Sequence, residues 1–129
     1  MIFRNARHTN QLELLVEFYT QITGLEVLGR FENHSGYDGV FLGHPTADWH
    51  LEFTQSTEQV KHAFDEDDCL VFYPTTQLAF NTILLSIEEK QITPIKAKNP
   101  YWNENGICIL DPDGYTVIIS PLKTTATTN

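Results

Sequence analysis

The apolar positions in the first half of the chain change their period in an order that predicts one strand, one helix and three further strands. Phe3 to His8 is a short alternating segment, which is typical of a strand. Apolar residues then recur at helical spacing, starting from Asn10, with Glu13 three residues later as in a capping box. Gly24 is a natural end for this helix. Three strand-like runs separated by turn residues follow: Leu25 to Phe31, Gly39 to Leu42 and Trp49 to Thr54.

The same order of patterns returns after a polar linker at about residues 55–66. Cys69 to Tyr73 is rich in residues that favour strands, and Thr76 to Glu89 carries apolar residues on one face of a helix. Asn99 to Trp102 is expected to be a loop, and the polar end of the chain, Thr124 to Asn129, is expected to fray. Three more strands are expected: Ile92 to Lys96, Ile107 to Leu110 and Tyr115 to Ile119.

The two halves align with each other, which predicts an internal duplication. One offset places Leu12 on Leu78 and Leu14 on Phe80, and it also places Trp49 to Thr54 on Tyr115 to Ser120. The segment that starts at Gly39 needs a slip of one residue in between, which a longer turn later reverses. We therefore expect a single domain, residues 1–129, built from two βαβββ modules at about 3–54 and 67–121.

Composition and charge narrow the classes of function. Seventeen Asp and Glu against eight Lys and Arg give a net charge of −9, which argues against nucleic acid and against an anionic membrane surface as partners. No apolar run approaches the roughly 20 residues that cross a bilayer, and charges stand where a signal peptide needs apolar residues. The two cysteines, Cys69 and Cys108, cannot form a disulfide framework and are expected to be small apolar residues in strands. We expect a soluble, cytoplasmic protein.

Three stretches carry a resemblance to a known superfamily: Phe18-Tyr19 with Gly24 to Leu28, His50 to Thr54, and Asp111-Pro112-Asp113-Gly114 before a final apolar strand. Together they resemble the vicinal oxygen chelate superfamily, which includes glyoxalase I, bleomycin-resistance proteins and extradiol dioxygenases. The resemblance extends from about Arg4 to Pro121. It implies an α+β fold in which two βαβββ modules form cup-shaped half-barrels. It also implies a homodimer that binds a small molecule inside the cups.

The resemblance further implies four positions for a divalent metal, one on each of the first, fourth, fifth and eighth strands. Carried over onto this sequence, the positions are Arg4, Glu52, Leu70 and Ile118. A different register on the fifth strand would place Asp68 or Cys69 there instead of Leu70. The usual ligands are His and Glu, which suit zinc, nickel, iron or manganese, and only Glu52 in this set is of that type. We therefore expect the usual four-ligand site to be absent and no cofactor to be required.

Two arrangements of the neighbouring polar residues stay open. Alternation puts Arg4 and His8 on one face of the first strand, and His50 and Glu52 on one face of the fourth. If these faces meet, His8, His50 and Glu52 could hold zinc, nickel, iron or manganese, as in a metal-dependent lyase or dioxygenase. Alternatively, Arg4 and Glu52 pair across the floor of the cup. Arg4 could then anchor a carboxylate or phosphate of a ligand, or the pair could be purely structural.

Three further residues have more than one possible role. Glu52 could act as the general base of a metal-free enzyme, although Arg4 nearby opposes that role by favouring the ionised carboxylate. Tyr101 and Trp102 could stack on an aromatic ligand, or could fill a dimer interface or a sheet edge.

Taken together, the sequence predicts a small-molecule-binding protein, in the manner of the antibiotic-sequestering members of the superfamily, without the usual metal site. The alternative is the metal-dependent lyase or dioxygenase. The predicted ligand-binding residues are Arg4, His8, His50, Tyr101 and Trp102.

Overall fold

The computed structural model describes residues 1–125 of the 129-residue chain. The chain divides into two compact units, Met1–His62 and Ala63–Asn129. The end of the chain was predicted to fray. There, the backbone N–H of Thr125 donates a hydrogen bond to the carbonyl oxygen of Thr75, and residues 126–129 lie outside the described range. No helix within residues 1–125 has the length and apolar character needed to cross a membrane.

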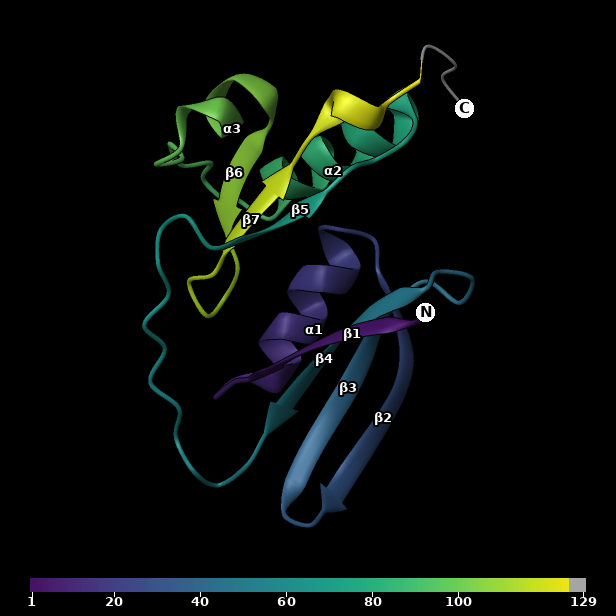
Figure 1. Cartoon of the computed structure of the whole chain (residues 1–129), viewed down its shortest axis with the longest axis vertical. Helices are drawn as coiled ribbons and strands as arrows, with labels where there is room; N and C mark the ends of the chain where they lie inside the picture. The colour runs from purple at the N-terminus through teal and green to yellow at the C-terminus, as the bar shows by residue number, and fades with distance from the viewer. Residues whose placement is uncertain (126–129) are drawn as a thin grey trace. The chain divides into compact units, whose positions relative to one another are not determined.

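The first unit has the predicted βαβββ order. Its sheet runs in the order β1-β4-β3-β2, with β1 parallel to β4 and the other neighbours antiparallel. The elements are β1 (Phe3–His8), α1 (Leu12–Gln21), β2 (Glu26–His34), β3 (Tyr37–Gly43) and β4 (Trp49–Gln55) (Figure 1).

Helix α1 packs against one face of this sheet and forms the core of the first unit. The ring of Tyr19 stacks on the ring of Phe53 from β4, with centroids 5.3 Å apart, and Leu51 is buried on the same side as Phe53, as predicted. Val40 and Leu42 of β3 are completely buried. Each such side chain contributes roughly 1.5–3 kcal/mol on full burial. Side chains alternate along a strand, so the residue between Val40 and Leu42 and the residues on either side of Leu51 point away from α1. We call the side of the sheet that faces away from α1 the distal face.

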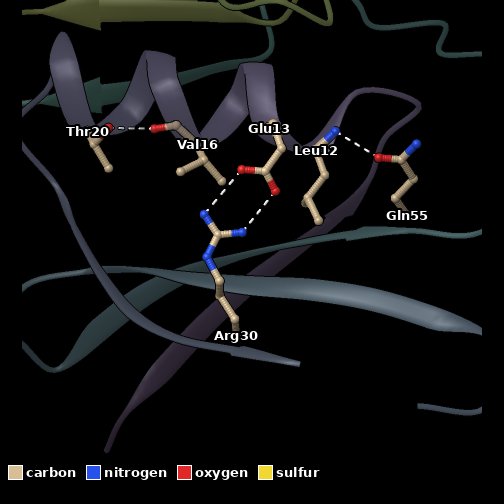
Figure 2. Close-up of polar contacts among 6 residues, drawn as sticks. All are labelled: Leu12, Glu13, Val16, Thr20, Arg30 and Gln55. Atoms are coloured by element: carbon tan, nitrogen blue, oxygen red, sulfur yellow. Dashed lines mark hydrogen bonds and ion pairs between the residues drawn. The ribbon is translucent and has the colours of Figure 1, made fainter. Parts of the chain in front are cut away.

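The start of α1 differs from the predicted capping box. The helix begins at Leu12, and the side chain of its N-cap residue, Gln11, makes no capping hydrogen bond. Instead, the backbone N–H of Leu12 donates to Oε1 of Gln55 at the end of β4, at 2.9 Å (Figure 2). Asn10 is used elsewhere, because its side chain exchanges two hydrogen bonds with the backbone of Val60. A neighbouring strand, not the local sequence, therefore caps this helix.

The other half of the predicted capping box, Glu13, binds Arg30 of β2. The guanidinium donates from both Nη atoms to the two carboxylate oxygens, at 2.9 and 3.2 Å (Figure 2). This hydrogen bonding is the main reason why the pKa of Arg30 is raised. Arg30 therefore points toward α1, whereas the distal face lies on the other side of its strand.

The first part of the predicted linker belongs to the first unit. Nε2 of His62 donates to the carbonyl oxygen of His8 at 2.8 Å, and Val60 is tied to Asn10 as described above. Both contacts lie at the junction between β1 and α1, so the chain returns to that junction after leaving β4.

The second unit resembles the first but has one strand fewer and an additional short helix. Its sheet runs in the order β5-β7-β6, with β5 parallel to β7 and β6 antiparallel to β7. The elements are β5 (Cys69–Phe72), α2 (Gln77–Glu89), α3 (Pro100–Asn105), β6 (Ile107–Leu110), β7 (Thr116–Ile119) and the 3-10 turn η1 (Pro121–Lys123) (Figure 1). Two open sheets with helices confirm the predicted α+β class with two modules.

Two predicted elements of the second unit are wrong. The strand expected at Ile92 to Lys96 is reduced to a single bridge between Ile95 and Cys108, because Pro94 has no N–H to donate to a ladder. The loop expected at Asn99 to Trp102 is instead the start of α3. The side chain of Asn99 caps this helix by accepting a hydrogen bond from the backbone N–H of Tyr101, and Pro100 follows at the first helical position.

Gly106, at the start of β6, is required by the closeness of its neighbour strand. A Cβ on Gly106 would lie 2.9 Å from the carbonyl oxygen of Ile119 and 2.9 Å from Cγ2 of Ile118. The carbonyl cannot move without disturbing the pairing of β6 with β7. We therefore expect Gly106→Ala to lower the free energy of unfolding by about 1–3 kcal/mol, measured by urea denaturation. Gly29→Ala is the matched control, because its Cβ would meet a side-chain atom at an ordinary 3.5 Å; equal stability of the two variants would contradict this account.

Candidate functional site

The distal face of the first unit carries the polar residues predicted on β1 and β4. In the parallel ladder, Arg4 pairs with His50, Ala6 with Glu52 and His8 with Thr54. Paired residues point to the same side of a sheet, so the predicted placement of Arg4 and His8 with His50 and Glu52 is confirmed.

Arg4 and Glu52 form the predicted ion pair. Nη1 of Arg4 donates to Oε1 of Glu52 at 3.1 Å, with the two side chains 50% and 12% exposed. Within residues 1–125 this is the only hydrogen bond of the Arg4 side chain. The remaining guanidinium donors therefore have no acceptor in the described part of the chain, and they are available to an added anion.

Phe41 lies at the centre of the distal face, and the sequence analysis missed it. Phe41 pairs with Glu52 across β3 and β4, and the guanidinium of Arg4 lies over its ring, 5.2 Å from the centroid. The rings of Phe31 and His50 each lie 5.8 Å from the ring of Phe41. The signal was present, because alternation along β3 gives Phe41 the opposite face from Val40 and Leu42. The result is a cation held above an aromatic floor.

His8 lies at one end of this face, and its ring is held by hydroxyl groups. Its Nδ1 lies 2.8 Å from Oγ1 of Thr54, and its Nε2 lies 3.1 Å from Oγ of Ser56. Thr54 is four residues along β4 from His50, or roughly 13 Å at the usual rise of a strand. No three His, Cys, Asp or Glu side chains among residues 1–125 gather closely enough to hold a metal ion. The alternative ligand set of His8, His50 and Glu52 is therefore not brought together.

The ladder of the second unit corrects the predicted register on the fifth strand. Leu70 pairs with Val117, whereas Val71 pairs with Ile118. Leu70 therefore points to the opposite face from Ile118, and the assignment of the fifth-strand metal position to Leu70 is wrong. The position equivalent to Arg4 lies two residues before the partner of Ile118, at Cys69. The sequence alignment followed the helices, and a slip of one residue in the strand turns every side chain to the other face.

The corrected set of four positions does not fit a divalent metal site. It consists of Arg4, Glu52, Cys69 and Ile118. Two of the four have no metal-binding atom, and one carries a permanent positive charge. Ile118 is completely buried and packs with Ala97 and Cys108 in a small apolar cluster.

Both cysteines are poor candidates for nucleophiles. Burial raises the pKa of the Cys108 thiol, and nearby Cys69 raises it further. Burial also raises the pKa of the Cys69 thiol, with smaller contributions from the negative charges of Asp68 and Asp67. The prediction that both lie in strands as small apolar residues is confirmed, with Cys108 buried and Cys69 half-buried.

The two adjacent aromatic residues of α3 lie in different surroundings. Trp102 packs against the cluster of Ala97, Cys108 and Ile118 on the sheet of the second unit. Tyr101 is 51% exposed, and its ring meets the ring of Trp102 edge-on at 4.9 Å. Trp102 therefore supports its own sheet, and a contact of either residue with a ligand stays a prediction.

Two family models match the chain, one in each half. The YycE-like N-terminal domain matches residues 3–54, and the YycE-like C-terminal domain matches residues 67–120. A curated relative, the uncharacterized protein YycE of Bacillus subtilis (strain 168), is 40% identical over 124 residues, which cover 93% of this chain and 87% of the relative.

Several solved structures share the fold. A YycE protein of unknown function from Bacillus subtilis superposes with a TM-score of 0.80 at 36% identity, covering 98% of this chain and 93% of that one. Glyoxalase I of Leishmania major gives a TM-score of 0.71 at 18% identity, covering 93% and 85%. The fosfomycin resistance protein FosX of Mesorhizobium loti gives 0.65 at 10% identity, covering 95% and 90%. These structures confirm the resemblance to the vicinal oxygen chelate superfamily at the level of the fold.

The raised pKa of Cys69 predicts a slow reaction with alkylating reagents. A higher thiol pKa means a smaller thiolate fraction at a given pH, and the thiolate is the reactive form. We expect iodoacetamide at pH 8 to modify Cys69 more slowly than free cysteine, with the rate rising as pH rises. Mass spectrometry of the digested protein measures this, and Asp68→Asn should speed the reaction. Labelling of Cys69 as fast as that of free cysteine would contradict the prediction.

Proposed function

The chain belongs to the YycE-like family, and from that premise we propose that it binds a small anionic molecule on the distal face, with Arg4 as the anchor and without a four-ligand metal site. The observation that supports the proposal is the guanidinium of Arg4, which is paired with Glu52 through a single hydrogen bond and lies over Phe41. A cation in that position has donors to offer, and it is held in place before any ligand arrives.

The electrostatics of the protein make such a local anchor necessary. At a net charge of −9, the chain as a whole repels anions. Binding of an anion therefore depends on donors at short range. A carboxylate or phosphate oxygen could accept hydrogen bonds from Nε and Nη2 of Arg4, while Nη1 keeps its bond to Glu52.

Three predicted residues complete the proposal. His50 stands beside Arg4 in the ladder and lies edge-on against Phe41, so its ring can offer an N–H to the same ligand. His8 lies at the other end of the face and contacts Tyr37 edge-on, where it can bind the far end of a longer molecule. Glu52 orients Arg4, and this engagement opposes its use as a general base.

Substitution of Arg4 tests this function with simple anions as probes. We expect acetate and inorganic phosphate, titrated into ¹⁵N-labelled protein, to shift the amide signals of β1, β3 and β4. Arg4→Gln should weaken binding about tenfold or more, because hydrogen bonds to charged groups contribute roughly 1.5–3 kcal/mol. Arg30→Gln is the matched control, since Arg30 lies on the opposite face and binds Glu13; it should leave the affinity unchanged.

Two results would contradict the proposal. One is equal anion binding by wild type and Arg4→Gln. The other is about one transition metal per chain in protein purified without an affinity tag, lost in Glu52→Ala, as measured by plasma mass spectrometry. That second result would favour the metal-dependent lyase or dioxygenase.

The predicted homodimer and cytoplasmic location also belong to this proposal. The support for the homodimer is the resemblance to a superfamily whose short members often pair. We expect light scattering after size-exclusion chromatography to give a mass of about twice the 14.8 kDa of the chain. A monomer at concentrations of tens of micromolar would contradict the dimer.

A further inference from the structure

Gly29, in the middle of β2, is required neither by a positive φ nor by a close contact from another strand. Its backbone is not in the left-handed region that favours glycine. Apart from its two neighbours in the chain, a Cβ built on it would meet a single atom within 4 Å, Cδ2 of Phe41, at an ordinary contact distance of 3.5 Å. A glycine inside a strand weakens the strand relative to alanine and often marks close approach of another molecule or another backbone.

The other two glycines of this face are explained by their surroundings. A Cβ on Gly39 would overlap the ring of Phe31, so that ring already occupies the space above Gly39. A Cβ on Gly43 would be tight against Cβ of His50, at 3.1 Å. The contrast leaves Gly29 as the glycine of this face at which no other strand blocks a Cβ.

The register shift in β2 does not explain Gly29 either. The pairing of β2 with β3 shifts between Val27 and Gly29, which makes Leu28 the extra residue. A bulge demands glycine where φ is positive, and Gly29 is not one of the positive-φ glycines. The space beside Phe41 therefore calls for a different occupant.

We propose that the ligand of the distal face is an aromatic carboxylate, whose ring fills the space at Gly29 and whose carboxylate binds Arg4. This inference rests on the function proposed above and names its ligand class. The guanidinium lies 5.2 Å from the centroid of Phe41, and the space at Gly29 adjoins Cδ2 of the same ring. Both positions therefore border the ring of Phe41, so one small molecule can contact both.

The surroundings of each end favour this class. An aromatic ring at Gly29 would lie beside Phe41, and aromatic pairs are favourable at centroid distances of roughly 4.5–7 Å. At the charged end, the planar guanidinium matches a planar carboxylate. The Glu52 carboxylate already shares the charge of Arg4, so a doubly charged phosphate meets more repulsion there than a carboxylate does.

A set of matched small molecules tests the inference by NMR titration of the whole chain. Phenylacetate is the probe, acetate lacks its ring and phenylacetamide lacks its charge. We expect phenylacetate to bind wild type at least tenfold more tightly than either of the others. Gly29→Ala and then Gly29→Val should progressively weaken phenylacetate binding and leave acetate binding unchanged. Gly29→Ala should also melt at or above the temperature of wild type, which shows that the loss is not one of folding.

The outcomes separate this inference from the proposed function. If acetate and phenylacetate bind equally in an Arg4-dependent manner, or if Gly29→Val keeps the preference for the ring, the aromatic class is wrong and the anion site stands. If phenylacetamide binds as tightly as phenylacetate, the inference that a carboxylate of the ligand binds the site is wrong. If no anion binds through Arg4, both the inference and the proposed function fail.

Discussion

The parallel pairing of β1 with β4 is the interaction on which the candidate site depends. These strands are far apart in the sequence, and the ladder between them brings Arg4 next to His50 and places Glu52 one step further along. A slip of one residue in this ladder would turn Arg4 toward α1 and bring Arg7 to the distal face. The register is held from the other side, because Phe53 stacks on Tyr19 and the guanidinium of Arg7 from β1 lies over the ring of Phe53. The apolar core on the α1 side of the sheet thus positions a polar site on the distal face.

Much of the fold and part of the site followed from local patterns, while contacts between distant segments did not. The pair of Arg4 and Glu52 was predictable because period-two alternation is a property of each strand alone. The start of α1 was not, because its cap comes from Gln55, far along the chain. Helix α3 was predictable, because Asn99 and Pro100 are ordinary signals for the start of a helix. A loop was predicted instead, because the two adjacent aromatic residues were interpreted as part of one. The face of the fifth strand could not be read from the helices, and the ladder selects Cys69 among the registers that the sequence left open.

The distal face combines an ion pair with an aromatic ring. The sequence predicted the pair of Arg4 and Glu52, and the structure adds an aromatic ring beneath the guanidinium. Phe41 takes part in both, because it lies under the guanidinium and borders the space at Gly29. An ion pair in water would be a weak and mobile anchor. Here the half-exposed guanidinium also lies over the ring of Phe41, and Glu52 accepts one hydrogen bond from it.

The distribution of tryptophan has a practical consequence for studies of the two units. The chain contains two tryptophans, and Trp49 lies in β4 of the first unit while Trp102 lies in α3 of the second. Trp102 packs against a small apolar cluster, and Trp49 contacts the ring of His44 edge-on. Each unit therefore carries its own intrinsic fluorophore in a distinct environment. A chain in which one indole is replaced by phenylalanine keeps an emission signal that reports on the other unit alone, so that cooperativity between the two halves becomes directly visible in a melting curve.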